Sequence, residues 1–489
     1  MMIRRILCTF AFALVAGTAA AAPAVQAGAG LDPRHLSKGQ IDQMQSPAAL
    51  LRAAALYKQG DDLDRLAWTL ERLTAFEPNV GELKLALATT YARQGEKTKA
   101  YDLLLGMQRV GYGYDLAENA DFAKISGTKV WTYITDGLKT NLKPFGEGKV
   151  AFSLPAGDHL YESLAWDPVR KQLLVGSVRD GTIMRADADG KLTDFIAAGA
   201  DGLWSVYAMA VDADDDALYV ASTASLYFKG FSQANYGQAG VFKFRLSNGK
   251  LLEKYLLPSG AQPNTLSSLA ARKGLVFAAD GLHNVIYRLD GGALKPMVAN
   301  PKLTSVRGLA LSDDGKTLYF ADYALGIFGV DLAAGKPFDL KYDPAKLALG
   351  GIDGLSWYDH RLVAIQSGMS PRRVMRIALA DDMKTVTAAM PLDAANPAFE
   401  LPTYGAVAGD SLYFVANSQK NAYDSYGSPK DERKLEPVKV FRTDLRFAWD
   451  GGTLTSAKVA PASSVISDSK PGSGVFSNVD GGSQSVTGN

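Results

Sequence analysis

A short stretch that recurs along the chain decides the fold. Its clearest copy is Gly308–Tyr319, which reads GLALSDDGKTLY. An apolar run ends in an Asp-Asp-Gly-Lys turn, and a second run rich in Leu, Tyr and Phe follows at once. Asp and Gly at this spacing are typical of a tight hairpin between two strands. The stretch therefore predicts a pair of antiparallel strands.

From Gly148 onward the same pattern occurs six times. The second strand of each unit is expected at Leu173–Ser177, Leu218–Ser222, Leu275–Ala279, Leu318–Ala321, Leu362–Gln366 and Leu412–Ala416. A third strand follows at Thr182–Ala186, Val241–Leu246, Val285–Leu289, Ile327–Leu332, Val374–Leu379 and Val438–Thr443. A fourth, polar-edged strand follows several units, as at Lys191–Ile196 and Lys250–Leu256. Six such units in series predict a mainly β protein with a six-bladed β-propeller over residues 148–460.

Two segments compete to close the propeller. Val150–Leu154 precedes the first complete unit and resembles a fourth strand, so it can pair into the last blade. Thr453–Val459 can take the same place, and the sequence does not decide between them. The tail, residues 461–489, is rich in Ser and Gly and is expected to be disordered.

The stretch from residue 46 to 140 has a helical period instead. Tyr57 and Tyr91 lie 34 residues apart, each shortly before a Gln-Gly pair, and Pro78 separates the two helical pairs. This part resembles tetratricopeptide repeats through Tyr57, Gly60, Pro78, Tyr91, Gly95 and Ala100. Asp115–Ile125 and Val130–Leu138 are expected as further helices. The helical domain forms either a peptide-binding groove or a support that packs on the next domain.

The start of the chain resembles an export signal. Arg4 and Arg5 precede an apolar core too short to span a bilayer, and small residues follow up to residue 27. We expect a signal peptide over residues 1–27, with an uncleaved membrane anchor as the alternative, and a linker over residues 28–45. The single cysteine, Cys8, lies in the signal, so the mature chain has no cysteine. A bacterial periplasmic or secreted protein is the expectation.

Composition narrows the function classes. The chain has 489 residues, 48 of them Gly, and its Lys+Arg total of 52 balances an Asp+Glu total of 51. Such a balance gives no overall field that would attract nucleic acid, and no transmembrane segment is expected once the signal is removed. Gly-x-Ser-x-Gly, P-loop, dinucleotide-fingerprint and HExxH motifs are missing from the sequence. The remaining candidates lie where the inner strands enter the central channel.

Matching the six units places one residue at the start of each inner strand. These are Glu162, Tyr207, Ser267, Arg307, Asp353 and Tyr404, and we call them the entry ring. Three charged residues at the head of apolar strands require partners, because a buried charge must be paired or bound. The entry ring is therefore either a structural network of hydrogen bonds or a ligand site at the channel mouth.

The units resemble the gluconolactonase and senescence-marker-protein propellers, and more distantly the NHL and strictosidine-synthase propellers. The matching stretches are Glu162–Asp167 (ESLAWD), Gly308–Tyr319 and Ile352–Leu355 (IDGL), within a likeness that covers about 148–461. The resemblance implies hydrolysis of a lactone or related ester at a divalent metal, often calcium, held by a Glu, an Asn and an Asp. Glu162 and Asp353 match the two acids. Arg307 stands in place of the Asn, and Leu266 and Ser267 replace an Asn-Asp pair.

Arg307 changes what the site is expected to bind. Calcium takes six to eight oxygen ligands, and a guanidinium at about 4 Å repels a divalent ion by roughly 8 kcal/mol at an effective dielectric of 20. Arg307 also offers a fork of donors that can bridge Glu162 and Asp353. We hypothesise that Arg307 replaces the metal as the central cation, leaving a salt-bridged hub or a pocket for an anionic or carbonyl ligand.

Other residues are weaker candidates. His159, three residues before Glu162, is a candidate general base. Trp204 and Tyr207, with Tyr404 opposite, are candidates for an aromatic wall against a sugar or another ring. His283, Asp280 and Asp322 are more typical of capped turns.

Two functions follow from these patterns. The first is a channel-mouth site that binds or hydrolyses a lactone, sugar acid or similar compound, through Glu162, Asp353, Arg307 and His159, with Tyr207, Ser267, Tyr404 and Trp204 contacting the ligand. The second is a non-catalytic interaction protein that uses the helical repeats and propeller surfaces to bind protein or peptide partners.

Overall fold

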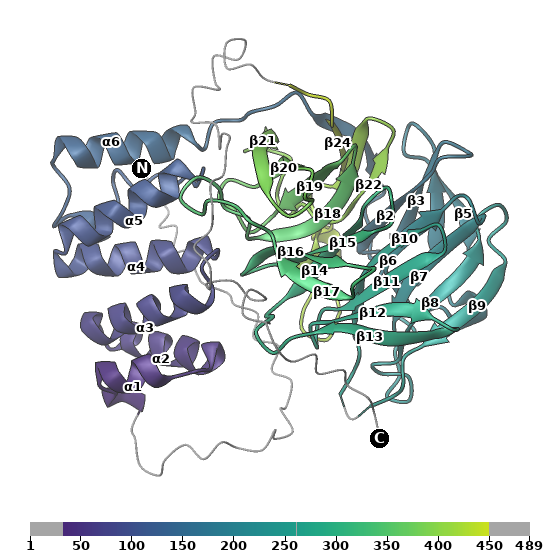
Figure 1. The fold of residues 1–489 in the computed structure, drawn as a ribbon, viewed down its shortest axis with the longest axis horizontal. Coiled ribbons are helices and arrows are strands. Elements are labelled where there is room, and N and C mark those ends of the chain that lie inside the picture. Colours follow the sequence, from purple (N-terminus) through teal and green to yellow (C-terminus); the bar gives the residue numbers. More distant parts are fainter. Residues whose placement is uncertain (1–32, 261, 449–489) are drawn as a thin grey trace.

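The computed structural model describes residues 33–260 and 262–448 and contains a helical module followed by a β-propeller (Figure 1). The expected signal peptide, the tail and the competing closing strand Thr453–Val459 lie outside the described residues. No helix in the described part combines the length and apolar character needed to cross a membrane.

The helical module consists of residues 33–140. Its helices pair as antiparallel neighbours, and side-chain caps start three of the long ones: Ser46 caps the first, Asp62 the second and Thr128 the last. The elements are η1 (Pro33–His35), α1 (Lys38–Gln43), α2 (Pro47–Gln59), α3 (Leu63–Phe76), α4 (Gly81–Gln94), α5 (Lys97–Arg109), η2 (Ala120–Phe122) and α6 (Lys129–Thr140).

The 34-residue repeat of the sequence corresponds to two helical hairpins, α2–α3 and α4–α5. Tyr57 and Tyr91 are both buried at the ends of α2 and α4, and Gly95 ends α4 in the left-handed conformation. Ala100 is fully buried where α5 packs on α4. The tetratricopeptide-like arrangement is therefore confirmed at the level of the fold.

Two details of the helical part differ from the expectation. The predicted helix Asp115–Ile125 is wrong: only η2 forms there, because the Asn119 side chain accepts a hydrogen bond from the Asp121 amide and starts a short turn. In the stretch expected as a linker, α1 forms with a complete capping box at Ser37 and fully buries Ile41.

Six four-stranded antiparallel sheets form the propeller. Blades 1 to 5 take their strands in chain order: β2 (Tyr161–Asp167), β3 (Gln172–Ser177), β4 (Ile183–Ala186), β5 (Leu192–Ile196); β6 (Ser205–Asp212), β7 (Ala217–Thr223), β8 (Ala239–Arg245), β9 (Leu251–Leu256); β10 (Leu266–Arg272), β11 (Leu275–Asp280), β12 (Val285–Asp290), β13 (Ala293–Ala299); β14 (Val306–Leu311), β15 (Thr317–Asp322), β16 (Gly326–Asp331), β17 (Lys336–Asp339); β18 (Ile352–Tyr358), β19 (Arg361–Gln366), β20 (Arg373–Leu379), β21 (Val386–Ala394). These bounds confirm the six-bladed fold predicted from the repeats.

Blade 6 is closed by a strand from the other end of the propeller. Its order is β1 (Lys149–Leu154), β24 (Val438–Asp444), β23 (Ser411–Val415) and β22 (Gly405–Ala408). Leu154 pairs with Val438, and Phe152 with Val440. The outer strand of the last blade thus comes from the segment before the first blade, which ties the two ends of the propeller together.

The helical module packs against blades 4 and 5. Figure 1 shows the helices to one side of the propeller, beside the green strands of these blades. The contact runs through the turns after β15 and β19, where Asn79 and Gly113 of the module meet the propeller backbone. Since β15 and β19 run antiparallel to the inner strands, these turns lie at the end of the propeller that carries the entry ring.

Candidate functional site at the channel mouth

The entry-ring residues share one backbone position. In β2, β6, β10 and β18 the pairing with the next strand shifts by one residue at Glu162, Tyr207, Ser267 and Asp353, and in β14 it shifts across Arg307 and Gly308. Tyr404 comes directly before β22. A bulge leaves its extra residue outside the ladder and re-aims the side chain. The repeated bulge is why the first five of these residues differ from the apolar strands that follow them, whereas Tyr404 stands outside its strand.

Arg307 and Asp353 form the charged centre of the mouth. Arg307 Nη1 pairs with Asp353 Oδ1, and the Ser367 hydroxyl donates to Asp353 Oδ2. The Arg307 guanidinium lies 4.3 Å from the centre of the Tyr323 ring, and its Nε donates to Ser305 Oγ at 3.1 Å. Asp353 is buried, whereas the Arg307 side chain remains 38% exposed. The guanidinium is therefore oriented by the protein while one face stays open to a ligand.

Glu162 is the second buried acid. The Ser418 hydroxyl donates to its Oε1, although the two residues are 256 positions apart. Burial raises the pKa of Glu162, while Lys420 and the Ser418 hydrogen bond oppose that rise. Ser418 and Lys420 belong to residues 416–437, the long connection between β23 and β24. A carboxyl with a raised pKa at a channel mouth is suited to proton transfer.

The connection 416–437 reaches across to blades 1 and 2. Tyr423 is buried with Leu160 and Val178, and its ring lies 6.2 Å from that of Tyr227 in blade 2. A Cβ on Gly427 would lie 2.3 Å from the carbonyl oxygen of Leu226, so only a glycine allows this close approach. This segment forms one wall of the mouth, and the helical module lies beside the other.

The remaining ring residues are polar and internally bonded. The Tyr207 hydroxyl donates to Ser225 Oγ at 2.8 Å. Burial raises the pKa of Tyr404, and the Asp353 carboxylate adds to the effect. Tyr404 hydrogen-bonds with Ser267. Burial raises the pKa of Tyr207 too, so both tyrosines stay protonated. The Tyr404 hydroxyl can donate to a ligand, whereas the Tyr207 hydroxyl, which donates to Ser225, can accept from one.

Two of the expected residues do not join the ring. The Trp204 ring packs edge-to-face on Phe242 at 5.7 Å, within the apolar contact of blades 1 and 2. His159 Nδ1 lies 2.7 Å from Asp180 Oδ2, and its ring stacks on Tyr161. Burial alone would raise the pKa of Asp180, but hydrogen bonds from His159, Lys229 and Ser177 lower it to about 2. His159 therefore sits in a network at the rim of blade 1.

The turn residues behave as caps. His283 Nδ1 lies 2.8 Å from Asp280 Oδ2, and Asp280 also accepts from the backbone amides of Leu282 and His283. Asp322 accepts from four backbone amides at the start of β14 and the turn after β15. Both acids fix turns rather than face the ring.

A small chamber lies directly below the ring. Its volume is about 50 Å³, and Ser163, Ser268, Gly308, Gly405 and Tyr404 are among its lining residues. A water needs about 10–15 Å³ of such volume, so the chamber accommodates a few water molecules. A ligand as large as a sugar must bind above the ring, against Arg307.

The donor set does not fit calcium. Asp353 already accepts from Arg307 and Ser367, and Glu162 accepts from Ser418. Where the resemblance implied an Asn as the third metal ligand, Arg307 is a cation that pairs with Asp353. Within residues 33–260 and 262–448, no group of three or more His, Cys, Asp or Glu is arranged to hold a metal ion. The cation at the centre of the ring is the Arg307 guanidinium.

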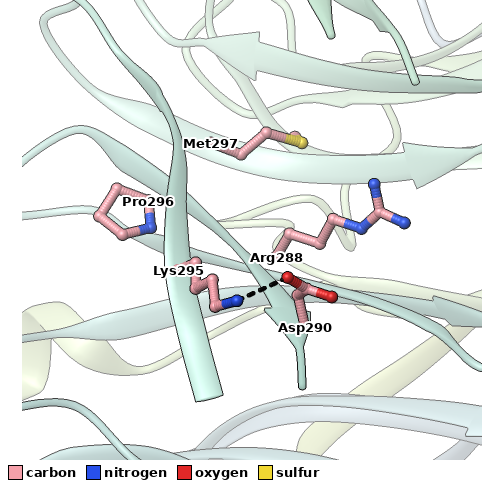
Figure 2. Close-up of a pocket in the computed structure, with 5 residues that line it drawn as sticks. All are labelled: Arg288, Asp290, Lys295, Pro296 and Met297. Carbon is pink, nitrogen blue, oxygen red and sulfur yellow. Dashed lines mark hydrogen bonds and ion pairs between the residues drawn. The ribbon is translucent and has the colours of Figure 1, made fainter. Parts of the chain in front are cut away.

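A larger depression lies on the outer strands of blade 3. Figure 2 shows its lining, in which Lys295 Nζ meets Asp290 Oδ2 at 2.7 Å beside Arg288, Pro296 and Met297. Its volume is about 240 Å³. Its acid and its lysine neutralise each other, and it lies on the outer strands β12 and β13, away from the inner strands that carry the ring.

Sequence reasoning missed the residues that hold the ring. Tyr323 and Ser367 are each the first residue after a second strand, and this shared register was a usable signal. Ser418 and Lys420 lie in a connection without a repeat, so no local pattern marks them. Only the folded chain brings them to Glu162.

Known proteins show only distant similarity to the chain. No protein-family model and no curated protein matches the chain. Solved structures similar to it include the PQQ-bound aldose sugar dehydrogenase of Streptomyces coelicolor, 18% identical with a TM-score of 0.41 over 62% of this chain and 99% of that one. A gluconolactonase of Xanthomonas campestris is 15% identical, with a TM-score of 0.40 over 62% and 91%.

Virginiamycin B lyase of Staphylococcus aureus is also similar, at 16% identity and a TM-score of 0.40 over 55% of this chain and 82% of that one. At such identities and TM-scores these likenesses assign no activity to this chain, because propellers host many chemistries. The strand pairing itself shows a six-bladed β-propeller preceded by a tetratricopeptide-like helical module. Gluconolactonase and sugar-dehydrogenase propellers are among the solved structures similar to it.

Proposed function

We propose that the channel mouth binds a small, hydroxyl-rich lactone or sugar acid and hydrolyses the lactone without a divalent metal. One observation carries the proposal: a guanidinium that is fixed by Asp353 and Tyr323, yet 38% exposed, stands at the mouth in the same ring as the buried acid Glu162. A fork of donors suits a carboxylate or a carbonyl oxygen.

The residues divide the reaction between them. Arg307 polarises the ligand carbonyl and stabilises the negative charge that develops on its oxygen. Glu162 Oε2 takes a proton from water while the water oxygen bonds to the carbonyl carbon. The bond from that carbon to the ring oxygen then breaks, and the leaving alcohol receives the proton. The chamber below the ring, which accommodates a few water molecules, can supply the attacking water.

Hydrolysis of D-glucono-1,5-lactone and of a simple aryl ester, with and without EDTA, tests the proposal. Glu162→Gln keeps the shape and the Ser418 contact but removes the base, so kcat should fall about 100-fold. Glu253→Gln, on the outer strand β9, is the matched control and should turn over like the wild type.

Four results are decisive. Turnover that survives EDTA and is lost in Glu162→Gln supports the proposal. Activity that appears only with added calcium contradicts the role given to Arg307. Binding of gluconate by calorimetry without any turnover supports ligand binding at the mouth and contradicts the hydrolysis. Neither binding nor turnover favours the alternative from the sequence, a non-catalytic interaction protein for protein or peptide partners.

Export is proposed from the sequence alone, because residues 1–27 lie outside the described part. Fractionation of the native bacterial cells and N-terminal sequencing test it. A mature chain that begins after residue 22 or 27 in the periplasm or medium supports export. A chain that retains Met1 in the cytoplasm contradicts it.

A further inference from the structure

The helical module holds the propeller through the turns after β15 and β19. The Asn79 amide donates to the carbonyl of Ala324 at 3.2 Å, and its side chain donates to that of Leu325 at 2.8 Å. At the second turn, the Gly113 amide donates to the Ser370 carbonyl at 2.6 Å, and the Ser370 hydroxyl donates back at 2.8 Å. Two turns of neighbouring blades are thereby fixed by backbone contacts.

The helical module and the propeller are packed too closely to slide past each other. A Cβ on Gly350 would lie 2.3 Å from the Asn79 Cβ, and one on Gly111 would lie 2.5 Å from a nitrogen of Arg373. Arg373 is buried and donates to the Val110 carbonyl at the end of α5. The module and blades 4 and 5 thus meet at close packing, where a small displacement of one moves the other.

The same two turns hold the charged centre of the mouth. Tyr323, at the first turn, carries the Arg307 guanidinium on its ring. Ser367, at the second, donates to Asp353. A Cβ on Gly368 would lie 2.2 Å from the Tyr323 hydroxyl, so the two turns also touch each other.

We infer that the helical module is a positioning element of the channel-mouth site, which sets Arg307 through Tyr323 and Asp353 through Ser367. Tyr323 is a positioning residue: its ring carries the guanidinium, and its turn is fixed by Asn79. The consequence for ligand binding rests on the proposed function, but the coupling between the module and Arg307 does not.

The test measures how readily the Arg307 guanidinium leaves its contacts with Tyr323 and Asp353 and reacts with a reagent in solution. The full-length protein without ligand is labelled with phenylglyoxal, and the rate at Arg307 is followed by peptide mass spectrometry. Arg272 is an internal reference, because it is 39% exposed and pairs with Asp313 at 2.7 Å, far from the mouth at the other end of its strand. Asn79→Ala/Ser370→Ala loosens the module, and Tyr323→Leu removes the ring under the guanidinium.

Loss of a cation–π contact should speed labelling of Arg307 about 2- to 5-fold relative to Arg272 in Tyr323→Leu. The double variant Asn79→Ala/Ser370→Ala should also label faster at Arg307. Tyr323→Phe, which keeps the ring, should label at the wild-type rate. Thermal unfolding shows that each variant is folded.

Unchanged labelling of Arg307 in the folded double variant would overturn the inference, whatever the protein hydrolyses. Equal labelling rates of Arg307 in Tyr323→Phe and Tyr323→Leu would show that the Tyr323 ring does not position the guanidinium. If labelling responds as expected but the wild type neither binds gluconate nor hydrolyses lactones, the proposed function fails while the coupling stands.

Discussion

Two buried arginines, Arg179 and Arg373, hold different sides of the channel mouth with different partners. Arg179, in blade 1, donates to both oxygens of Asp158 at 2.6 and 2.8 Å and to the Tyr227 carbonyl of blade 2. Arg373, in blade 5, donates to the Gln366 side chain and to the Val110 and Ala348 carbonyls.

The partners shift the two pKa values in opposite directions. Burial alone would lower the pKa of Arg179, but Asp158 raises it. Burial lowers the pKa of Arg373 to about 10. On the side of the mouth covered by residues 416–437, Arg179 is thus held by an opposite charge. On the side next to the helical module, Arg373 is held by close packing and neutral hydrogen-bond acceptors. Charge pairs depend on pH, and packing does not.

The largest effect is expected for Arg179→Met. The substitution leaves the Asp158 carboxylate, which is 15% exposed, with only Lys229 at 3.7 Å as an ion-pair partner among the described residues, and should lower the free energy of unfolding by about 3 kcal/mol at pH 7. Asp158 has a lowered pKa, because the contacts with Arg179 outweigh the effect of burial. Its stabilisation is therefore present at neutral pH and fades below about pH 4. Urea unfolding at several pH values measures both.

Arg373→Met is the matched substitution. It strands only neutral acceptors, so the loss should be about 1–2 kcal/mol and should not change with pH. A loss of equal size and equal pH dependence in the two variants would contradict the contrast between the two sides.

The next effect concerns the junction between the helical module and β1. Asp393 accepts from the Gly148 amide at 2.8 Å and from the Thr443 hydroxyl at 2.7 Å, and burial raises its pKa to about 6. A raised carboxyl pKa costs stability as pH rises through about 4 to 6. Asp393→Asn should therefore stabilise the protein by about 2 kcal/mol at pH 8 and leave it unchanged near pH 4.

Urea unfolding of Asp393→Asn and the wild type at pH 8 and pH 4 measures this difference in the free energy of unfolding. Thr443→Val, which removes one donor to Asp393, is the control and should destabilise at pH 8. Destabilisation by Asp393→Asn at pH 8 would show that the carboxylate stabilises this junction.

The smallest effect is expected for Asp180→Asn, with the opposite sign. The pKa of Asp180 is lowered to about 2, so its charge stabilises the fold above about pH 4 and this contribution is lost as pH falls toward 2. The substitution should cost about 1 kcal/mol at pH 7, and the gap to the wild type should close toward pH 2.5. Thermal unfolding between these pH values measures it, with Asp189→Asn, in the exposed turn after β4, as the control. A gap that widens in acid would contradict the role of Asp180.

Much of the fold was predictable because it repeats. Alternating apolar runs and Asp-Gly turns located every second and third strand of the propeller to within two residues at most ends. The Asp115–Ile125 helix was wrong because a side-chain cap at Asn119 favoured a short turn. Trp204 was expected at the mouth but packs on Phe242, since a strand period alone does not distinguish an inter-blade face from a channel.

The sequence by itself determined the number of blades, the two helical hairpins and which residue heads each inner strand. These features are predictable because each depends on a sequence pattern among residues that lie close together in the chain. The tertiary structure alone decided that Val150–Leu154 closes blade 6, that Ser418 reaches Glu162, and that the helical module packs against the turns that hold Arg307 and Asp353. These contacts join residues as far as 256 positions apart, and close packing of whole elements selects them.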